Sequence, residues 1–418
     1  MTVDAHKATD IVAIQRRTVS TLSMTQMLSG IAVAGSLPAG ALIAAGLGGD
    51  GAAGLAQTAG VLGAALLALP LARMALVRGR RIALATGYAI GAAGAAIVVF
   101  AGVAGALWAV LLGCLLLGVS TAAGYQGRYA ATDLAVPEHR GRALAIVVWA
   151  GTIGAVLGPN LLEFTGNLAL TFGLPQLTGP YVLATIVLMA GALLLVLRLR
   201  PDPYLLARSI AARASGQITH PSLRDGLAHL RGHRRAVLGI AAVSIGHVVM
   251  VMVMVMTPVH MSHVDVSLQL IGLVISVHVL GMFALSPVVG WAVDRFGRVE
   301  VIVVGVMILA TSCVISGVAP GDDIPLLGTG LFLLGLGWSC TLIAGSTLLT
   351  DDAEAADRPA VQGLSDLSMN VAGALGGVIA GVIVVQFSYG LLCAVALIPV
   401  LALAGLVATP AMRTARHG

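Results

Sequence analysis

Residues 290–298 read Gly-Trp-Ala-Val-Asp-Arg-Phe-Gly-Arg, and this short segment joins two long apolar runs. The run before it is about Leu268–Val293, and the run after it is about Val299–Ala319. An α-helix of roughly 20 residues crosses the hydrocarbon core of a bilayer, and both runs reach that length. Charged residues between two such runs predict a helical hairpin that crosses a membrane twice.

The rest of the chain repeats this pattern. The sequence has 418 residues, of which 58% are hydrophobic and 10% are charged, whereas soluble domains are about 25% charged. We therefore predict an all-α integral membrane protein with twelve transmembrane helices in two six-helix halves. The twelve runs are about Thr21–Leu47, Ala53–Val77, Ile82–Gly102, Ala106–Thr132, Ala143–Phe164, Gly179–Leu199, Ala236–Met261, Leu268–Val293, Val299–Ala319, Pro325–Leu349, Val361–Gln386 and Gly390–Thr409.

The predicted domains follow from these runs. A tail over 1–20 precedes a bundle over 21–199, a polar loop over 200–235 precedes a second bundle over 236–409, and a tail over 410–418 ends the chain. Lys and Arg gather in every second connection, for example Arg78, Arg80 and Arg81, and the alternate connections hold none. Because basic loops face the cytoplasm, we predict a multi-pass protein of the cytoplasmic (inner) membrane with both termini inside the cell.

The two halves also share a weak internal repeat. Arg78-Gly79-Arg80-Arg81 follows the second run, at the position that residues 290–298 occupy after the eighth. Internal repeats of this kind are typical of secondary transporters, whose substrate sites lie near the middle of the membrane. The central loop and the repeat together favour a transporter over an enzyme, and we find no nucleophile and base pattern in the loops.

The twelve-run plan and the second copy of the repeat resemble the major facilitator superfamily. Gly290, Asp294, Arg295, Gly297 and Arg298 match the cytoplasmic loop motif of that family. The resemblance implies two pseudo-symmetric halves that alternate access to a central site, with Asp294, Arg295 and Arg298 at the cytoplasmic gate.

The copy in the first half departs from the family motif. Leu76 stands where the family has Asp, and Ala72 stands where it has Gly. This departure weakens the loop-to-helix charge contact that we expect in the first half, although the Arg-Gly-Arg-Arg tail is kept.

Soft metal ligands mark the seventh and eighth runs. Met250 and Met254 share one helical face, as do His278 and Met282. Thioether and imidazole groups suit Cu(I). Counted from the ends of their runs at ~1.5 Å per residue, Met250 and His278 lie at similar depth. These motifs are similar to those of the CcoA-like copper importers, which implies a path for inward movement of copper as the substrate. The alternative is that the methionines are adaptable packing.

Further His and Met residues lie on the same stripe or at its outer mouth. His247 and Met261 continue the stripe, and His260 and His263 sit where the seventh run ends. We predict that these four residues capture metal, with solvated loop histidines as the alternative. Apart from copper as a transported ion, we expect no cofactor.

Four polar residues fall inside predicted membrane helices or at their ends. Asp366, with Asn370 one turn later, is a candidate for proton coupling, because carboxylates within the membrane mark proton relays. Its alternative role is a structural hydrogen bond near the cytoplasmic gate. Arg128 and Asp133 lie in the inner third of the fourth run and are predicted to form gate salt bridges, with substrate contact as the alternative.

Gly154, Gly158 and Pro159 mark the fifth run as a site of close packing and bending. They resemble the antiporter signature of the same superfamily, which is common in drug–proton exporters. A proton-coupled exporter of drugs or other amphipathic small molecules is therefore the alternative to copper import. In either case we expect the partners to be the lipid bilayer and a metal ion or small-molecule substrate, with no nucleic acid and a monomeric chain.

Overall fold

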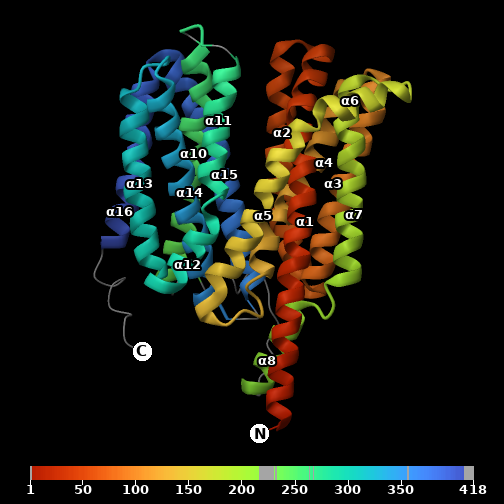
Figure 1. The fold of residues 1–418 in the computed structure, drawn as a ribbon, viewed down its shortest axis with the longest axis vertical. Helices are drawn as coiled ribbons and strands as arrows, with labels where there is room; N and C mark the ends of the chain where they lie inside the picture. Colours follow the sequence, from red (N-terminus) through yellow and green to blue (C-terminus); the bar gives the residue numbers. More distant parts are fainter. Residues whose placement is uncertain are drawn as a thin grey trace. The chain divides into compact units, whose positions relative to one another are not determined.

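The computed structural model describes residues 2–215, 230, 233–262, 264–266, 268–354 and 357–408, and the regular structure in these ranges is helical (Figure 1). Twelve of the described helical segments are long and apolar enough to cross a membrane. The predicted all-α, twelve-helix class is therefore confirmed. The physical reason is that long apolar runs can satisfy their backbone hydrogen bonds in lipid only as helices or closed barrels.

The chain divides into two compact units. Unit 1 comprises Met1–Val136, Ile146–Leu227 and Glu354–Leu367, and unit 2 comprises Pro137–Ala145, Ala228–Ala353 and Ser368–Gly418. The first half of the chain holds the helices α1 (Thr2–Gly48), α2 (Asp50–Arg78), α3 (Arg80–Ala104), α4 (Leu107–Ala130), η1 (Pro137–His139), α5 (Arg140–Asn160), α6 (Leu162–Thr171), η2 (Gln176–Thr178), α7 (Gly179–Arg198) and α8 (Pro203–Ser215). The second half holds α10 (Arg234–Ser262), α11 (Leu268–Phe283), α12 (Ser286–Phe296), α13 (Arg298–Val318), α14 (Ile324–Asp352), α15 (Arg358–Gln386) and α16 (Tyr389–Ala408).

Some helix boundaries differ from the predicted ones. Helix α1 begins at Thr2, so most of the segment predicted as a tail continues the first membrane helix. Helix α8 occupies part of the segment predicted as a polar loop. The first turns of α1 and the whole of α8 were missed because their polar residues carry no membrane signal, although a polar stretch can still form a helix.

The eighth predicted span is two helices rather than one. Helix α11 ends at Phe283, and α12 begins at Ser286 with Pro287 in its first turn. A proline has no N–H to donate and clashes with the carbonyl four residues earlier, which is that of Phe283. The chain therefore breaks at 284–285 and restarts, since proline is well suited to the first turn of a helix.

The internal repeat is visible in two matching turns. Gly79 is the single residue between α2 and α3, with φ of 87°, and Gly297 is the single residue between α12 and α13, with φ of 115°. Side chains disfavour positive φ, and glycine does not. The glycines of the two motif copies are therefore required by the same sharp helix-to-helix turn.

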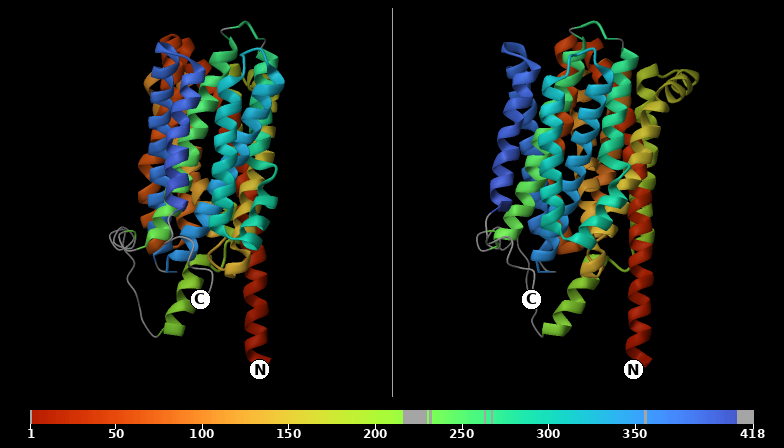
Figure 2. Two further views of the ribbon diagram at one scale, coloured as in Figure 1. Left: turned by 90° about the vertical axis from the view of Figure 1, so that its left-hand side faces the viewer. Right: turned by 60° about the vertical axis from the view of Figure 1, so that its left-hand side comes forward.

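Glycines also set the helix packing within each unit. In unit 1, Gly118 of α4 lies against the backbone of Gly60 in α2. In unit 2, α14 contacts α10, α11 and α13 (Figures 1 and 2). A Cβ atom on Gly345 of α14 would lie 2.7 Å from the carbonyl oxygen of Gly239 in α10. Small residues at such crossings let helices approach closely in a membrane.

Candidate functional site

A buried ion pair joins α4 to the first turns of α15. The Nη2 atom of Arg128 lies 2.8 Å from Oδ1 of Asp366, and the two side chains are 3% and 1% exposed. Both residues belong to unit 1. A carboxylate and a guanidinium buried together compensate each other's charge, whereas either alone would be costly at this depth.

Two tyrosines surround the guanidinium of this pair. The Cζ atom of Arg128 lies 4.8 Å from the ring centroid of Tyr129 and 5.4 Å from that of Tyr125. The Tyr129 hydroxyl accepts a hydrogen bond from Arg128 at 3.3 Å and lies 3.3 Å from the hydroxyl of Ser365. Cation–π contacts and hydrogen bonds thus hold Arg128 in place beside Asp366.

A second buried ion pair lies in the same unit. Arg80 donates from Nε to Oδ2 of Asp133 at 3.0 Å and from Nη2 to Oδ1 of Asp133 at 3.4 Å. Arg80 is fully buried and also donates to the side-chain carbonyl of Gln362. Arg128 and Asp133, both predicted to form salt bridges, therefore each do so, with partners from other helices rather than with each other.

In the sequence, Arg80 stands out only as one of the basic loop residues. Its position in the repeat, which matches that of Arg298, is the signal that would have singled it out. Beside it, Leu76 packs with Tyr204 and Ala360 in a buried cluster. Leu76, which stands where the family motif has an Asp, is therefore part of an apolar contact in this chain.

In the motif copy of the second half, the position that matches Leu76 holds Asp294 and makes polar contacts. Asp294 accepts hydrogen bonds from the backbone N–H groups of Gly141 and Arg142, both at 2.9 Å, where α5 begins. A carboxylate at this place compensates the positive end of the helix. Arg298 donates to Asp351 at 2.8 Å, and Arg140 donates to the other oxygen of Asp351 at 2.5 Å. Arg295 is exposed. Asp351, which sequence reasoning missed, thus bridges two arginines.

His278 is buried in unit 2 and bonded to a neighbouring helix. Its Nδ1 atom lies 2.8 Å from the carbonyl oxygen of Leu331 in α14, so Nδ1 carries the proton and donates. Its Nε2 atom is buried and has no hydrogen-bond partner within the described ranges. That nitrogen keeps a lone pair that a metal ion or another donor can use.

The predicted metal ligands differ in their burial. Met250 is buried at 5% exposure, whereas Met254 and Met282 are partly exposed. The described residues hold no group of three or more His, Cys, Asp or Glu side chains suited to a metal. The four-residue metal path therefore stays a prediction.

The residues predicted to capture metal are mostly engaged in packing. His260 stacks on Tyr389 with ring centroids 4.4 Å apart, and its Nε2 lies 3.2 Å from the carbonyl oxygen of Ala319. His247 accepts a hydrogen bond from the indole of Trp338 at 3.2 Å. Met261 is fully buried. His263 lies outside the described residues.

The remaining predicted residues lie on α5 and α15. Gly154 and Gly158 lie against α1, close to the backbones of Gly30 and Gly35, so α5 approaches α1 at these glycines. Pro159 falls inside α5 near its end. Asn370 is buried one turn beyond Asp366.

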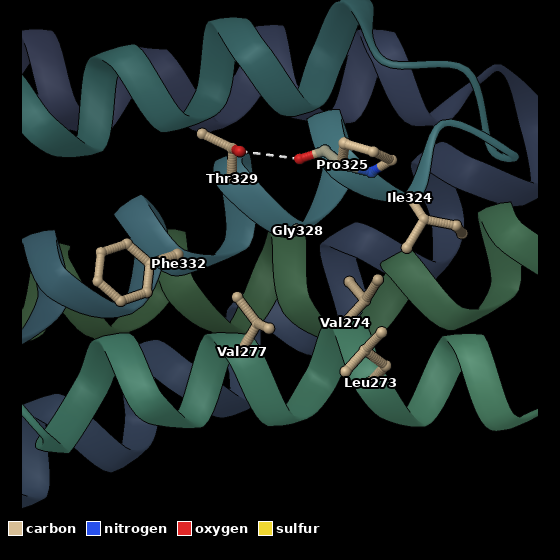
Figure 3. A pocket seen from close by; sticks show the side chains of 8 residues that line it. All are labelled: Leu273, Val274, Val277, Ile324, Pro325, Gly328, Thr329 and Phe332. Carbon is tan, nitrogen blue, oxygen red and sulfur yellow. Dashed lines mark hydrogen bonds between the residues drawn. The ribbon is translucent and has the colours of Figure 1, made fainter.

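An apolar groove opens between α11 and α14 (Figure 3). Its volume is about 470 Å³. The side chains of Val274 and Val277 point from α11 toward α14, where Phe332 and Gly328 line the other wall. The only hydrogen bond drawn there links the Thr329 hydroxyl to the carbonyl of Pro325, at 2.8 Å. Such a lining favours hydrocarbon over a metal ion or a charged group.

Comparison with known proteins supports a single family. The profile described as Major Facilitator Superfamily matches residues 22–267 and 242–417. The chain is 37% identical over 380 residues to the uncharacterized MFS-type transporter YdeG of Bacillus subtilis (strain 168), covering 90% of this chain and 88% of that protein. It is 31% identical over 313 residues to the riboflavin transporter RfnT of Brucella anthropi, covering 74% of each.

Solved structures share the fold. The human organic anion transporter MFSD10 (TETRAN) superposes with a TM-score of 0.70 over 94% of this chain and 99% of that one, at 18% identity. An identity this low supports the fold alone. Taken together, these comparisons support the superfamily and not the narrower resemblance to copper importers.

Proposed function

The chain belongs to the Major Facilitator Superfamily, and from that premise we propose that it is a secondary transporter that couples the movement of an organic small molecule to a proton. The observation that carries this proposal is the Arg128–Asp366 pair, buried between α4 and α15. Titratable groups buried in membrane helices are costly, and they mark proton and substrate pathways.

The chemistry of the pair suits coupling. Only the ionised form of Asp366 compensates the charge of Arg128, so protonation of the carboxylate releases the guanidinium from its partner. Tyr125 and Tyr129 still hold the cation in place by their ring faces. Once its ion pair with Asp366 is broken, the Arg128 guanidinium can bind an anionic or hydrogen-bonding group of the solute. Deprotonation of Asp366 then restores the ion pair.

An organic solute is favoured by two observations. A relative of this chain is named as a riboflavin transporter. In addition, unit 2 brings Trp338 together with Phe283, at 5.7 Å between ring centroids, and with His247. Aromatic rings of this kind suit contact with planar or apolar molecules.

Copper import is the second candidate, and the buried Nε2 of His278 favours it. An imidazole whose other nitrogen donates to a backbone carbonyl is held in the tautomer that a metal ligand requires. Met282 lies one helical turn further along α11 and would supply a soft donor to an ion that reached this nitrogen.

A transport assay on purified protein in liposomes separates the two candidates. Riboflavin, several amphipathic organic ions and Cu(I) are offered as solutes under an imposed proton gradient. In the source cell, both termini of the protein are expected in the cytoplasm. The first proposal is supported if an organic solute is transported by the wild type and by Asp322→Asn but not by Asp366→Asn. Asp322→Asn is the control because Asp322 is an exposed loop carboxylate. Copper import is supported if the wild type takes up copper, His278→Gln does not, and none of the organic solutes is transported.

A further inference from the structure

One end of α2 carries an open groove that combines apolar and basic side chains. The groove has a volume of about 440 Å³. It lies on the last three turns of the helix and is lined by Leu69, Pro70, Arg73, Met74, Val77 and Arg78. These positions form two adjacent ridges at spacings of four residues, so all six side chains share one face of α2.

The two arginines of the groove are exposed, and neither has an acidic partner among the residues that the structure describes. No ion pair or hydrogen bond of the Arg73 or Arg78 side chain occurs within the described ranges. The acid nearest the turn, Asp202, instead accepts hydrogen bonds from the backbone N–H groups of Arg81, Tyr204 and Leu205. Within the part of the chain that the structure describes, the charges of the groove are therefore open to a ligand.

Helix chemistry accounts for Arg78 but not for Arg73. Arg78 is the last residue of α2, where a cation is stabilised by the negative end of the helix. Arg73 lies five residues earlier, about 7.5 Å back along the axis at ~1.5 Å per residue, beyond the reach of that effect. A charge inside a membrane helix needs a partner or a path to water.

The apolar face continues away from the groove toward the middle of the membrane. Leu66 and Leu62 follow on the same face and are 61% and 47% exposed. In the groove itself, Val77 is 71% exposed. A ligand that fits this surface has an anionic head for the two arginines and a hydrocarbon tail for the leucines.

We propose that this groove binds the headgroup phosphate of an anionic phospholipid from the leaflet that the basic loops predict to be cytoplasmic. Arg73 and Arg78 hold the phosphate, and an acyl chain lies along Leu66 and Leu62. Clusters of Lys and Arg at this level of a membrane protein attract acidic lipids. The site is independent of the transported solute, so it stands or falls separately from the proposed function.

Native mass spectrometry of the full-length protein in detergent tests the site. Phosphatidylglycerol and phosphatidylcholine with the same acyl chains are titrated against the wild type, an Arg73→Gln/Arg78→Gln variant, an Arg73→Lys/Arg78→Lys variant and an Arg198→Gln control. Arg198 is an exposed arginine at the end of α7, so the control tests whether any basic residue near the membrane surface has the same effect.

The wild type is expected to prefer phosphatidylglycerol by roughly 30-fold, the effect of two basic residues near an anionic surface. The double glutamine variant is expected to lose this preference to within about twofold, while the lysine variant and Arg198→Gln keep most of it. The proposal is overturned if the wild type shows no preference, if the double glutamine variant keeps it, or if Arg198→Gln loses it equally.

Discussion

Arg128 of α4 and Asp366 of α15 form a buried ion pair although 238 residues separate them in the sequence. The pair is almost completely shielded from solvent. It therefore resembles other buried pairs, for which losing one partner is far more costly than losing both.

This asymmetry gives the first prediction. Asp366→Ala is expected to lower the free energy of unfolding by about 3–5 kcal/mol, because Arg128 is left buried without a counter-ion. The double variant Arg128→Met/Asp366→Leu is expected to be clearly more stable than Asp366→Ala. Thermal unfolding of the detergent-solubilised protein measures both, and a double variant less stable than the single one would contradict the ion-pair account.

The Arg80–Asp133 pair gives a second prediction. Asp133→Ala removes both carboxylate oxygens from a fully buried guanidinium and is expected to cost about 3–5 kcal/mol. Gln362→Ala removes one neutral acceptor from the same guanidinium and is expected to cost about 1–3 kcal/mol. Equal losses in thermal stability for the two variants would show that the charge of Asp133 has no special role.

The crossing of α11 over α14 gives a third prediction. A Cβ atom at Gly335 would lie 2.6 Å from the backbone nitrogen of Met282 and would clash with the carbonyl oxygen of His278. Gly335→Ala is therefore expected to destabilise the protein by about 1–3 kcal/mol. Gly405→Ala is the control, since a Cβ atom built there meets no described atom within 4 Å beyond its own turn of the helix. It is expected to be neutral or to stabilise α16 by up to about 1 kcal/mol. If both alanine variants melt at the same temperature, this helix crossing does not depend on glycine.

His278 gives a fourth prediction, on stability rather than transport. His278→Ala removes the imidazole that donates to the Leu331 carbonyl and opens a cavity, which together are expected to cost about 2–4 kcal/mol. Leu280→Ala on the same helix is the comparison, because Leu280 is 51% exposed and its loss is expected to cost less than about 1 kcal/mol. Thermal unfolding of the two variants measures the loss of stability in each. A smaller loss for His278→Ala than for Leu280→Ala would refute the structural role of the His278 hydrogen bond.

The sequence predicted the number and class of the helices because the length of an apolar run is a direct physical signal. It also singled out Arg128 and Asp366, since a charge within such a run is rare enough to stand out. It could not pair them, because the partner of each depends on how distant helices pack. Asp351, near the end of α14, carries no such signal, and Arg80 is marked only by its place in the repeat.

Other differences come from local chemistry that the apolar pattern hides. The pattern runs unbroken through Pro287, yet the structure divides the span there into α11 and α12. Helical spacing and the family resemblance predict the methionine stripe of the seventh run and His278 of the eighth. Spacing places residues on one face of a helix, but it does not show which residues of other helices contact that face. In the structure, the His278 imidazole meets the backbone of α14.

The central claim is that Asp366 couples a proton to the movement of a solute. The most direct test uses liposomes that contain the wild type or Asp366→Asn and compares two measurements with the same solute. One measurement is accumulation driven by an imposed proton gradient, and the other is exchange of labelled for unlabelled solute without a gradient. We predict that Asp366→Asn loses the driven accumulation and keeps the exchange. Driven accumulation at the wild-type level in Asp366→Asn would contradict the account.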